Sequence, residues 1–463
     1  MFKSFLTSAV LLTALYLPAA VSAAPIDNLR TSVSPARVRI VLDSREPIKY
    51  KLDKDGLELT IDLPDSKVAA QEPKIKDAAI KSIKLQAKGR ESGRLVVKLK
   101  KDCQYKVYQL QGPNRLVLDI FRISIVKQSR SLADGVTYTY LQDELNGRQI
   151  QAYLVEVKPD SAYELRPFSA AGIYNGRGSL SRQAQSRNLL AAINSSYFDT
   201  DGWVIGSTKD KGRFVSVDGQ PRSGFASKAG AAGQVVPDIA YSGRLRLPNG
   251  IYLDIKGMNR VRIADDLVLY NEYYAPTTKT NAFGREIKLR GNKVIAVGTA
   301  GNMSIEPGTY VISGHGTSAA ALSGVRVGDR LILMESLGSD AADAAETVVS
   351  GGPLLLKSGQ VNVRAAEENI AADIARGKAP RTAVGVKRDG TLQLLVVDGR
   401  SNNSAGVTLA ELAQYFLRLG AVEAVNFDGG GSSEMVIKGQ IVNKPSDGRE
   451  RLVSMGLGIF TKQ

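Results

Sequence analysis

The sequence contains one cysteine, Cys103, and one histidine, His315. A single cysteine cannot form a disulfide within the chain, and a single histidine excludes a metal site built from several histidines. We predict that Cys103 is a half-buried strand residue, because no histidine lies nearby to activate the thiol. His315 lies between two glycines in ISGHG. It is a candidate for substrate binding or proton transfer, although loop histidines are more often structural.

Long apolar runs are also scarce, and the one that exists lies at the N-terminus. Lys3 precedes an apolar run from Phe5 to about Ala20, which is followed by the small-x-small sequence 21–23. This pattern predicts a signal peptide over residues 1–23 and export of the mature chain. The alternative is an uncleaved anchor, but the run is short for a span of about 20 residues. No later stretch is long and apolar enough to cross a membrane, so we expect no transmembrane segment after cleavage.

Positive charge is concentrated in the first part of the chain. The 463 residues include 61 Lys and Arg against 46 Asp and Glu, a formal net charge of +15. Residues 26–130 hold 23 of these bases and 13 of the acids, a net charge of +10. An exported basic module favours an anionic cell-wall or envelope polymer as its partner, such as peptidoglycan, although the charge is also explained by solubility. Export and the lack of an aromatic-basic signature argue against nucleic acid.

Residues 26–122 consist of short segments that alternate apolar and polar side chains. Gly, Pro, Asp and Asn separate them, which predicts a small all-β sandwich of about seven strands. The segments are RVRIVLDS, IKYKL, LELTIDL, IKSIKLQ, RLVVKLK, YKVYQL and RLVLDIF. The stretch resembles an AMIN domain in VRIVLDS, LDKDGLELTIDLP and NRLVLDIF. The resemblance implies targeting to the cell wall or envelope, without chemistry.

The sequence after residue 122 predicts a linker over residues 123–135 and a second domain over residues 136–463. In this second domain strands are mixed with few helices. The fold class is therefore α+β: a small all-β sandwich followed by a larger mixed α/β domain. The clearest helix is TLAELAQYFLRLG, where Thr408 and Glu411 form a capping-box pattern and Gly420 is placed as the stop.

Two aspartates follow apolar strand patterns. Asp398 ends the strand 392–397, and Asp428 ends the strand 421–427. If these strands are parallel neighbours joined by the predicted helix, both carboxylates leave the same edge of a sheet, where ligand sites form. The two acids are then expected near one cleft.

The sequence after Asp428 is unusual because three glycines and a serine follow it. Gly429, Gly430 and Gly431 can adopt conformations that point backbone N–H groups at an anion, and Ser432 adds a hydroxyl donor. The alternative is a tight turn in which Asp428 caps local N–H groups.

The segment INSSYFD forms a second constellation at a strand end. Asn194 is a candidate for a sugar hydroxyl, Tyr197 for packing on a sugar ring, and Asp199 for an acid, base or metal ligand. The alternative for Asp199 is an Asx-turn. The sequence D-T-D-G misses the spacing of a calcium loop.

Further candidates come from glycines and arginines. Gly351 and Gly352 lie between apolar runs, and predict either close backbone approach to a ligand or a sheet bend. Arg381 precedes a buried strand and can bind phosphate or carboxylate with its planar fork, or form an internal salt bridge. Arg400 follows Asp398 and is a further candidate for substrate binding.

In their order, these pieces resemble the phosphodiester glycosidase family, over about residues 150–460. The matching pieces are INSSYFD, ISGHG, VVSGGPLLL, PRTAVGV, VVDGR, GVTLAELAQYFLRLGAVEAVNFDGGGSSEM and VNKPSDGRERLVSMGLGIF. The resemblance implies hydrolysis of the glycosidic bond of a sugar-1-phosphodiester, such as one of N-acetylglucosamine. This chain has Ser195 and Ser196 where the family usually has two glycines, and the added side chains narrow that part of the expected cleft.

That chemistry needs an anion site and a carboxylate that activates water or attacks the anomeric carbon. Arg381 and the N–H groups of the triple glycine suit the anion. Asp428 and Asp199 are the first choices for the carboxylates and Asp398 is next, with Glu434 in reserve and the roles left open. We expect no required cofactor, while a divalent cation such as calcium stays an open alternative.

The sequence thus predicts an exported hydrolase that acts on a sugar phosphodiester in an envelope glycopolymer or exopolysaccharide. One alternative is a transferase that moves a sugar phosphate onto a wall polymer. Another is a wall-polysaccharide-binding or morphogenesis protein without enzymatic activity.

Overall fold

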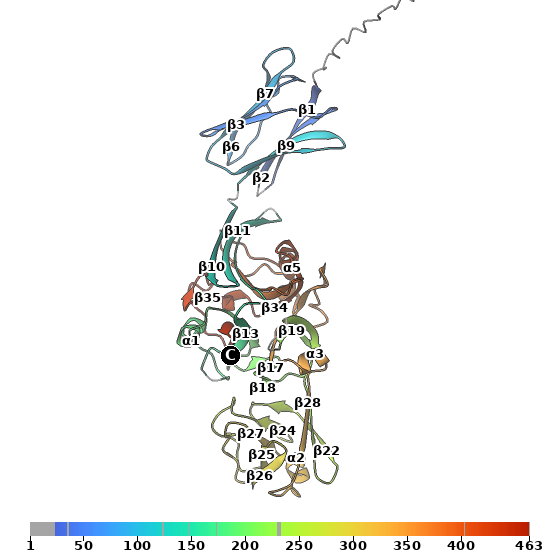
Figure 1. Ribbon diagram of the computed structural model, residues 1–463, viewed down its shortest axis with the longest axis vertical. Coiled ribbons are helices and arrows are strands. Elements are labelled where there is room, and N and C mark those ends of the chain that lie inside the picture. Colours follow the sequence, from blue (N-terminus) through green and yellow to red (C-terminus); the bar gives the residue numbers. More distant parts are fainter. Residues whose placement is uncertain are drawn as a thin grey trace, which may run out of the picture. The chain divides into compact units, whose positions relative to one another are not determined.

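The computed structural model describes residues 24–34, 37–122, 125–146, 148–172, 174–228, 233–401 and 403–462 (Figure 1). The predicted signal peptide, residues 1–23, lies outside the described residues. The chain divides into two compact units, Met1–Ser124 and Ile125–Gln463. Among the described residues, no helix is both long and apolar enough to span a membrane.

The first unit is a sandwich of two sheets, as its alternating segments predicted, and their strands pair antiparallel except for the short parallel pair of β1 and β5. One sheet has the order β5-β1-β2-β9-β8 and the other β3-β4-β7-β6. Every predicted segment overlaps a strand, because alternating side chains bury one face of each sheet in a shared apolar core. Cys103 is buried in this core, in a loop rather than in a strand. The strands are β1 (Ala24–Val33), β2 (Arg37–Ser44), β3 (Lys51–Asp55), β4 (Glu58–Leu63), β5 (Ser66–Lys67), β6 (Ile80–Ala87), β7 (Gly93–Leu99), β8 (Tyr105–Leu110) and β9 (Asn114–Phe121).

The second unit begins with a strand where we expected a linker. Strand β10 (Val126–Ala133) pairs antiparallel with β11 (Val136–Leu145). It is an edge strand whose middle residues are polar and exposed, so its composition is that of a loop. Only Leu132 and Ala133 pack against the core. The linker interpretation therefore fails for residues 126–133.

The second unit is built on an eight-stranded sheet with the order β10-β11-β12-β33-β32-β34-β30-β31. Strands β33 and β34 are both antiparallel to β32, which lies between them. They are therefore parallel to each other but are not neighbours, because the turn at 389–390 folds β32 back beside β33. The further bounds are β12 (Arg148–Val157), β30 (Leu354–Lys357), β31 (Gln360–Val361), β32 (Arg381–Lys387), β33 (Leu392–Val397) and β34 (Ala421–Asn426).

The two faces of this sheet are covered differently. Helix α5 (Leu409–Arg418) covers one face beside β34 and β30 (Figure 1). Thr408 and Glu411 form the predicted capping box. On the other face an apolar core is shared with the sheet β13-β37-β14-β35-β36. Its strands are β13 (Tyr163–Ser169), β14 (Ala191–Asn194), β35 (Met435–Ile437), β36 (Gln440–Ile441) and β37 (Met455–Thr461).

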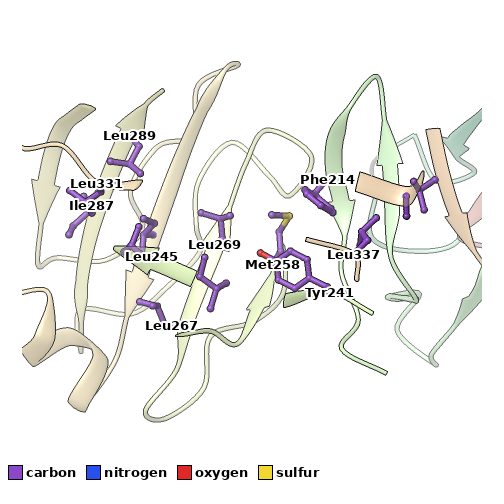
Figure 2. Packing of buried hydrophobic residues seen from close by; sticks show 14 of the residues in the cluster. Phe214, Tyr241, Leu245, Met258, Leu267, Leu269, Ile287, Leu289, Leu331 and Leu337 are labelled. Atoms are coloured by element: carbon purple, nitrogen blue, oxygen red, sulfur yellow. The ribbon is translucent and has the colours of Figure 1, made fainter. Parts of the chain in front are cut away.

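The middle of the second unit forms further small sheets around their own core. Figure 2 shows side chains of this core, among them Leu245, Met258 and Leu269, packed between the strands. Its sheets are β18-β17-β29-β19-β20, β22-β21-β28 and β23-β24-β27-β25-β26, and β15 pairs with β16. The strands are β15 (Tyr197–Phe198), β16 (Val204–Ile205), β17 (Thr208–Asp210), β18 (Arg213–Ser216), β19 (Arg222–Ser227), β20 (Gln234–Ile239), β21 (Ser242–Arg246), β22 (Tyr252–Ile255), β23 (Gly257–Met258), β24 (Leu267–Tyr270), β25 (Arg285–Arg290), β26 (Lys293–Gly298), β27 (Thr309–Gly314), β28 (Ile332–Ser336) and β29 (Thr347–Ser350).

The remaining helices are short. They are α1 (Leu180–Ser186), α2 (Thr317–Ala321), α3 (Asp340–Asp343), α4 (Ala372–Arg376) and the 3-10 turn η1 (Gly430–Ser432). The observed architecture is mostly β with few helices, which confirms the α+β fold class and its two-part arrangement.

Candidate active site

The structure brings three of the predicted residues to one edge of the eight-stranded sheet. Arg381 begins β32 opposite Val397, the last residue of β33, and Asp398 follows directly. Residue 426, the last of β34, pairs with residue 383, so Asp428 leaves the sheet at the same edge. The same-edge prediction for the two aspartates is therefore confirmed, although a third strand separates theirs.

Two asparagines hold the chain after β34 in place. The Asn194 side chain donates to the backbone oxygen of Asp428 (2.7 Å) and accepts from Thr382 (2.7 Å) and from the Glu434 N–H (3.0 Å). Asn443 Nδ2 donates to Asp398 Oδ1 (3.2 Å) and to the Ser433 carbonyl (3.0 Å). Asn194 thus bridges strand ends, and this network gives it a positioning role rather than the expected contact with a sugar hydroxyl.

The Asp428 carboxyl group is half-buried beside this loop. Burial raises its pKa to about 6, and the charge of Arg451 opposes the rise. The group is therefore largely ionised at neutral pH but gains a proton in mildly acidic solution. A carboxylate with such a pKa is suited to accept a proton from water or to attack a carbon centre.

Two of the three glycines after Asp428 lie against arginine side chains. A β-carbon at Gly429 would stand 3.0 Å from the Pro380 carbonyl oxygen, and one at Gly430 would stand 3.3 Å from Arg400 Nη2. At Gly431 the guanidinium of Arg451 leaves no space for a β-carbon. Gly430 also has a left-handed backbone, with φ of 61°.

One of the three N–H groups of the expected cradle is engaged by a carbonyl. The N–H of Gly430 donates to the Pro380 carbonyl (2.9 Å). The N–H groups of Ser432 and Ser433 donate back to the Gly429 and Gly430 carbonyls, at 3.1 and 3.2 Å. The Gly429 N–H bonds to the Asp428 carboxyl group, which is the local capping that we gave as the alternative.

Arg381 is buried and held by carbonyl oxygens. Its Nε donates to the Val407 carbonyl (3.0 Å), and Nη2 donates to the carbonyls of Ile374 and Gly377 (both 2.6 Å). Burial lowers its pKa, and the charge of Arg400 acts in the same direction. Among the described residues, neither of these arginines has a carboxylate within salt-bridge distance, whereas Arg451 pairs with Asp447. The salt-bridge alternative for Arg381 is therefore wrong, and the site carries uncompensated positive charge.

Asp398 is buried and fully engaged. Its carboxylate accepts from the Tyr153 hydroxyl (3.0 Å), from Asn443 and from the Lys444 N–H (3.1 and 3.2 Å). Burial raises its pKa, and these donors oppose the rise. The arrangement makes Asp398 an anchor for the segment 442–444.

A second buried carboxyl group lies on the same loop. Glu434 is 3% exposed, and its Oε1 has no hydrogen-bond partner among the described residues. Burial, together with neighbouring Glu450, raises its pKa to about 9, so Glu434 is protonated at neutral pH. Glu450 is held by the N-terminal residues of α1, where it accepts from the Ser179 hydroxyl and from the Ser181 N–H (2.8 Å each).

Tyr197, Gly351 and Gly352 lie next to the end of β34. The Tyr197 hydroxyl donates to the Gly352 carbonyl (2.9 Å) and accepts from Asn426 (3.0 Å). A β-carbon at Gly351 would stand 2.6 Å from the Asn426 carbonyl, and Gly352 has φ of 100°. Gly351 therefore allows close approach to the protein's own backbone, whereas a β-carbon at Gly352 would meet the Glu368 carboxylate, at 2.5 Å from Oε2.

Asp199 and His315 are not brought into this network. Asp199 is exposed and accepts from the N–H groups of Asp201 (3.0 Å) and Trp203 (2.8 Å), which is the Asx-turn alternative. His315 follows β27 in a different sheet, and its Nδ1 accepts from the Asp265 N–H (3.2 Å). The shared pocket that we expected for Asp199 with Asp428 is not formed by these contacts.

Several buried polar atoms around the strand ends lack partners. In the described part of the chain these are the hydroxyl oxygens of Ser195, Ser196, Ser432 and Ser433, together with Asn426 Oδ1 and Glu434 Oε1. Buried polar atoms are nearly always hydrogen-bonded, so unpaired ones indicate a place for water or ligand. The same described residues contain no group of three or more His, Cys, Asp or Glu side chains that could hold a metal ion.

Sequence reasoning missed the partners of the acids. Tyr153, Asn443, Glu450 and Arg451 contact Asp398, Asp428 or Glu434 but were not singled out. Three of them lie in VNKPSDGRER, where a polar, charged run directly precedes the buried last strand. A charged run beside a buried strand was the signal in the sequence that could have identified these residues.

The comparison with protein families confirms both resemblances. Residues 283–460 match the phosphodiester glycosidase family model, and residues 82–139 match the AMIN domain model. A 67-residue stretch is 46% identical to N-acetylglucosamine-1-phosphodiester alpha-N-acetylglucosaminidase of Bos taurus. A 76-residue stretch is 46% identical to the SPbeta prophage-derived uncharacterized protein YomE of Bacillus subtilis. These stretches cover 14% and 16% of this chain, and only 12% of each relative's length.

The fold is shared with two crystal structures at low sequence identity. A protein from Synechocystis superposes with a TM-score of 0.64 at 21% identity, over 95% of this chain and 81% of the other. A protein from Burkholderia pseudomallei K96243 gives a TM-score of 0.57 at 21% identity, over 89% of this chain and 96% of the other. The chain thus matches the AMIN domain model and, after it, the phosphodiester glycosidase model, in the order that its sequence motifs predicted.

Proposed function

We propose that the second unit hydrolyses the glycosidic bond of a sugar-1-phosphodiester, with N-acetylglucosamine as the first sugar to test. The family match supports this reaction class. The observation that carries the proposal is the glycine loop after Asp428, where the guanidinium groups of Arg400 and Arg451 lie against Gly430 and Gly431, beside a carboxylate whose pKa is about 6. Cleavage of a sugar-1-phosphodiester requires positive groups that bind the phosphate and a carboxylate that acts at the anomeric carbon next to it.

In the proposed reaction the guanidinium groups of Arg400 and Arg451 bind the phosphate oxygens, and Arg381, which backbone carbonyls hold in place, contributes its positive charge. The ionised Asp428 carboxylate activates a water molecule or attacks the anomeric carbon itself. The bond between that carbon and the phosphate oxygen breaks, its electron pair leaves with the phosphate, and water finally supplies the new hydroxyl on the sugar. Glu434, protonated at neutral pH, is the available proton donor.

The proposed setting is the cell envelope. The signal-peptide pattern and the AMIN domain support export, and the basic first unit supports attachment to an anionic wall or envelope glycopolymer. The substrate is then a sugar phosphodiester within that glycopolymer or within an exopolysaccharide. A direct check is to fractionate cells that express the full chain and to ask whether residues 1–23 are removed from the protein found outside the cytoplasm.

We propose that the reaction needs no resident metal ion, because phosphate is already a fair leaving group and the arginines supply positive charge. Dialysis of the enzyme against a chelator tests this point. Activity that disappears on dialysis and returns with calcium would overturn it.

The experiment that tests the reaction is incubation of the mature protein with a small N-acetylglucosamine-1-phosphodiester, followed by quantification of free sugar. Asp428→Asn is expected to remove the activity while the fold is retained, and Asp254→Asn, an exposed acid paired with Arg244, is the matched control. Activity of Asp428→Asn at the wild-type level would reject the site.

The same experiment separates the alternatives. A transferase transfers the sugar phosphate only when an acceptor glycan is present, so free sugar formed without acceptor supports hydrolysis. Binding of the diester without any turnover would support the non-enzymatic alternative.

A further inference from the structure

A tyrosine-lined groove lies in the second unit, beside the candidate site. Its volume is about 580 Å³, which is within the usual range for a site that binds a small molecule. We call it the tyrosine groove. Its lining residues are Gln128, Ser129, Arg130, Tyr138, Tyr140, Gln151, Tyr153, Asn403, Val442, Asn443 and Lys444.

The strand register places three tyrosines on one face of the sheet. Tyr140 pairs with Gln128 of β10 on one side and with Tyr153 of β12 on the other. Tyr138 lies two residues from Tyr140 on the same strand and therefore points to the same face. The rings of Tyr140 and Tyr153 have centroids 5.5 Å apart and are tilted by 51°. The three rings thus form an aromatic wall.

Polar groups of a particular kind surround this wall. The Arg130 guanidinium lies over the ring of Tyr138, 5.2 Å from its centroid, and Gln151 Nε2 donates to the Tyr140 hydroxyl (2.8 Å). Asn403 and Lys444 are exposed at the rim. The lining contains amides, hydroxyls and cations but no carboxylate.

The groove is connected to the candidate site through two of its own residues. The Tyr153 hydroxyl donates to Asp398, the acid that follows β33. Asn443 donates both to Asp398 and to the Ser433 carbonyl, on the loop that carries Asp428. A ligand in the groove is therefore in contact with residues that fix the position of the catalytic loop.

We propose that the tyrosine groove binds further sugar units of a glycan chain, so that the substrate is an oligosaccharide or polysaccharide rather than a small diester. This inference rests on the proposed function for the role of the groove in turnover. Tyrosine rings can pack on the apolar faces of sugar rings, while amide and guanidinium donors bond to hydroxyl groups. The cations also suit a glycan that carries acidic groups.

Binding of glycan pentasaccharides to the full mature chain tests the proposal without requiring turnover. The probes are chitopentaose, cellopentaose and a pentamer of galacturonic acid, with oligothymidine as a separate arm, and titration calorimetry gives the affinities. We expect at least one glycan to bind. Tyr138→Ala and Arg130→Ala are each expected to weaken its binding by at least about tenfold, as for loss of one stacking or charged contact.

The chain offers a matched control pair in Tyr252 and Arg244, which stack at 4.9 Å in a different sheet. Tyr252→Ala is expected to leave glycan affinity unchanged. The proposal is overturned if wild-type protein binds none of the three glycans, if it binds only oligothymidine, or if both groove variants bind the glycan as tightly as wild-type protein. Arg130 is exposed, so its variant stays informative if Tyr138→Ala fails to fold.

Hydrolysis gives a second readout that separates this inference from the proposed function. With the small diester, Tyr138→Ala is expected to keep the wild-type kcat/KM, while its KM for a glycan that carries the phosphodiester rises about tenfold. Glycan binding that depends on Tyr138 in a protein without hydrolytic activity would uphold the groove and reject the proposed reaction. An equal loss of activity on the small diester in Tyr138→Ala would instead overturn the role of the groove in binding distant sugar units.

Discussion

The guanidinium of Arg451 lies against Gly431 so closely that no β-carbon fits between them. The same loop brings Gly430 to Arg400, at 3.3 Å from the position of a β-carbon to Nη2. Gly430 and Gly431 therefore allow the two guanidinium groups to lie close to the loop that follows Asp428. A loop with alanine in these positions would push positive charge away from the carboxylate.

Gly431→Ala tests this relationship directly. The new methyl group must displace the Arg451 guanidinium and the Asp447 carboxylate, which removes one cation from Asp428 and from the phosphate site. Because Gly431 does not have a positive φ, alanine imposes no backbone strain. We expect the kcat/KM for the diester to fall at least about tenfold, with only a small change in the melting temperature.

Gly324→Ala is the matched control, since a β-carbon at Gly324 meets nothing within 4 Å. It is expected to keep full activity. A Gly431→Ala enzyme with wild-type kinetics would show that the position of Arg451 does not matter for the reaction.

The raised pKa of Asp428 predicts a pH-dependent effect on stability. Its pKa is about 6 in the folded protein and about 3.8 when the chain is unfolded, so the folded state binds the proton more tightly. Protonation of Asp428 therefore stabilises the folded state. This stabilisation is fully present below pH 4 and is lost as the pH rises through 6. Asp428→Asn, which does not titrate, should therefore gain on the order of 2 kcal/mol relative to wild-type protein between pH 4 and pH 7.

Urea unfolding of both proteins at the two pH values measures this gain, and Asp254→Asn shows the effect of removing an exposed acid. An Asp428→Asn variant whose stability relative to wild-type protein is the same at pH 4 and pH 7 would contradict the raised pKa.

The same titration predicts the pH profile of the reaction. If ionised Asp428 activates water or attacks the sugar, kcat/KM should fall about tenfold for each pH unit below about 6. Initial rates with the small diester between pH 4 and pH 8 give the profile. A rate that stays constant down to pH 4 would assign the chemistry to a group other than Asp428.

Arg400→Ala separates substrate binding from folding. Arg400 is exposed, and its side chain makes one hydrogen bond to the residues that the structure describes, a long contact of 3.4 Å with Ser446, so its loss should leave the melting temperature unchanged. Losing a cation beside the phosphate should raise KM by about tenfold. Arg290→Ala, at an exposed position on β25, controls for the change in net charge. An unaltered KM in Arg400→Ala would exclude this arginine from the anion site.

Much of the fold could be read from local patterns. The capping box of α5 and the alternating segments of the first unit are short-range signals, and each is present as predicted. The shared edge of Asp398 and Asp428 was also predictable, because both follow buried strands of the same direction. The position of β32 between β33 and β34 was not, since its pairing with β34, which is distant in sequence, is set by tertiary packing rather than by the residues within each strand.

The site itself was only partly predictable for the same reason. The acids and glycines can be seen in the sequence, but the roles of Asn194 and Asn443 depend on which atoms meet across more than 40 residues of chain. Asp199 illustrates the opposite case. Its turn partners lie two and four residues away, so the local alternative was sufficient to explain it.

Strand β10 gives the last prediction, because its polar composition conceals a structural role. Residues 126–133 pair along β11. Two of them, Leu132 and Ala133, pack against the core, and Arg130 lies over the ring of Tyr138. A fragment of residues 125–463 should therefore fold as a unit, whereas a fragment of residues 134–463 leaves β11 as an unprotected edge. We expect the shorter fragment to melt at least about 5 °C lower and to aggregate more readily. Equal melting temperatures by calorimetry would show that residues 126–133 are a dispensable linker after all.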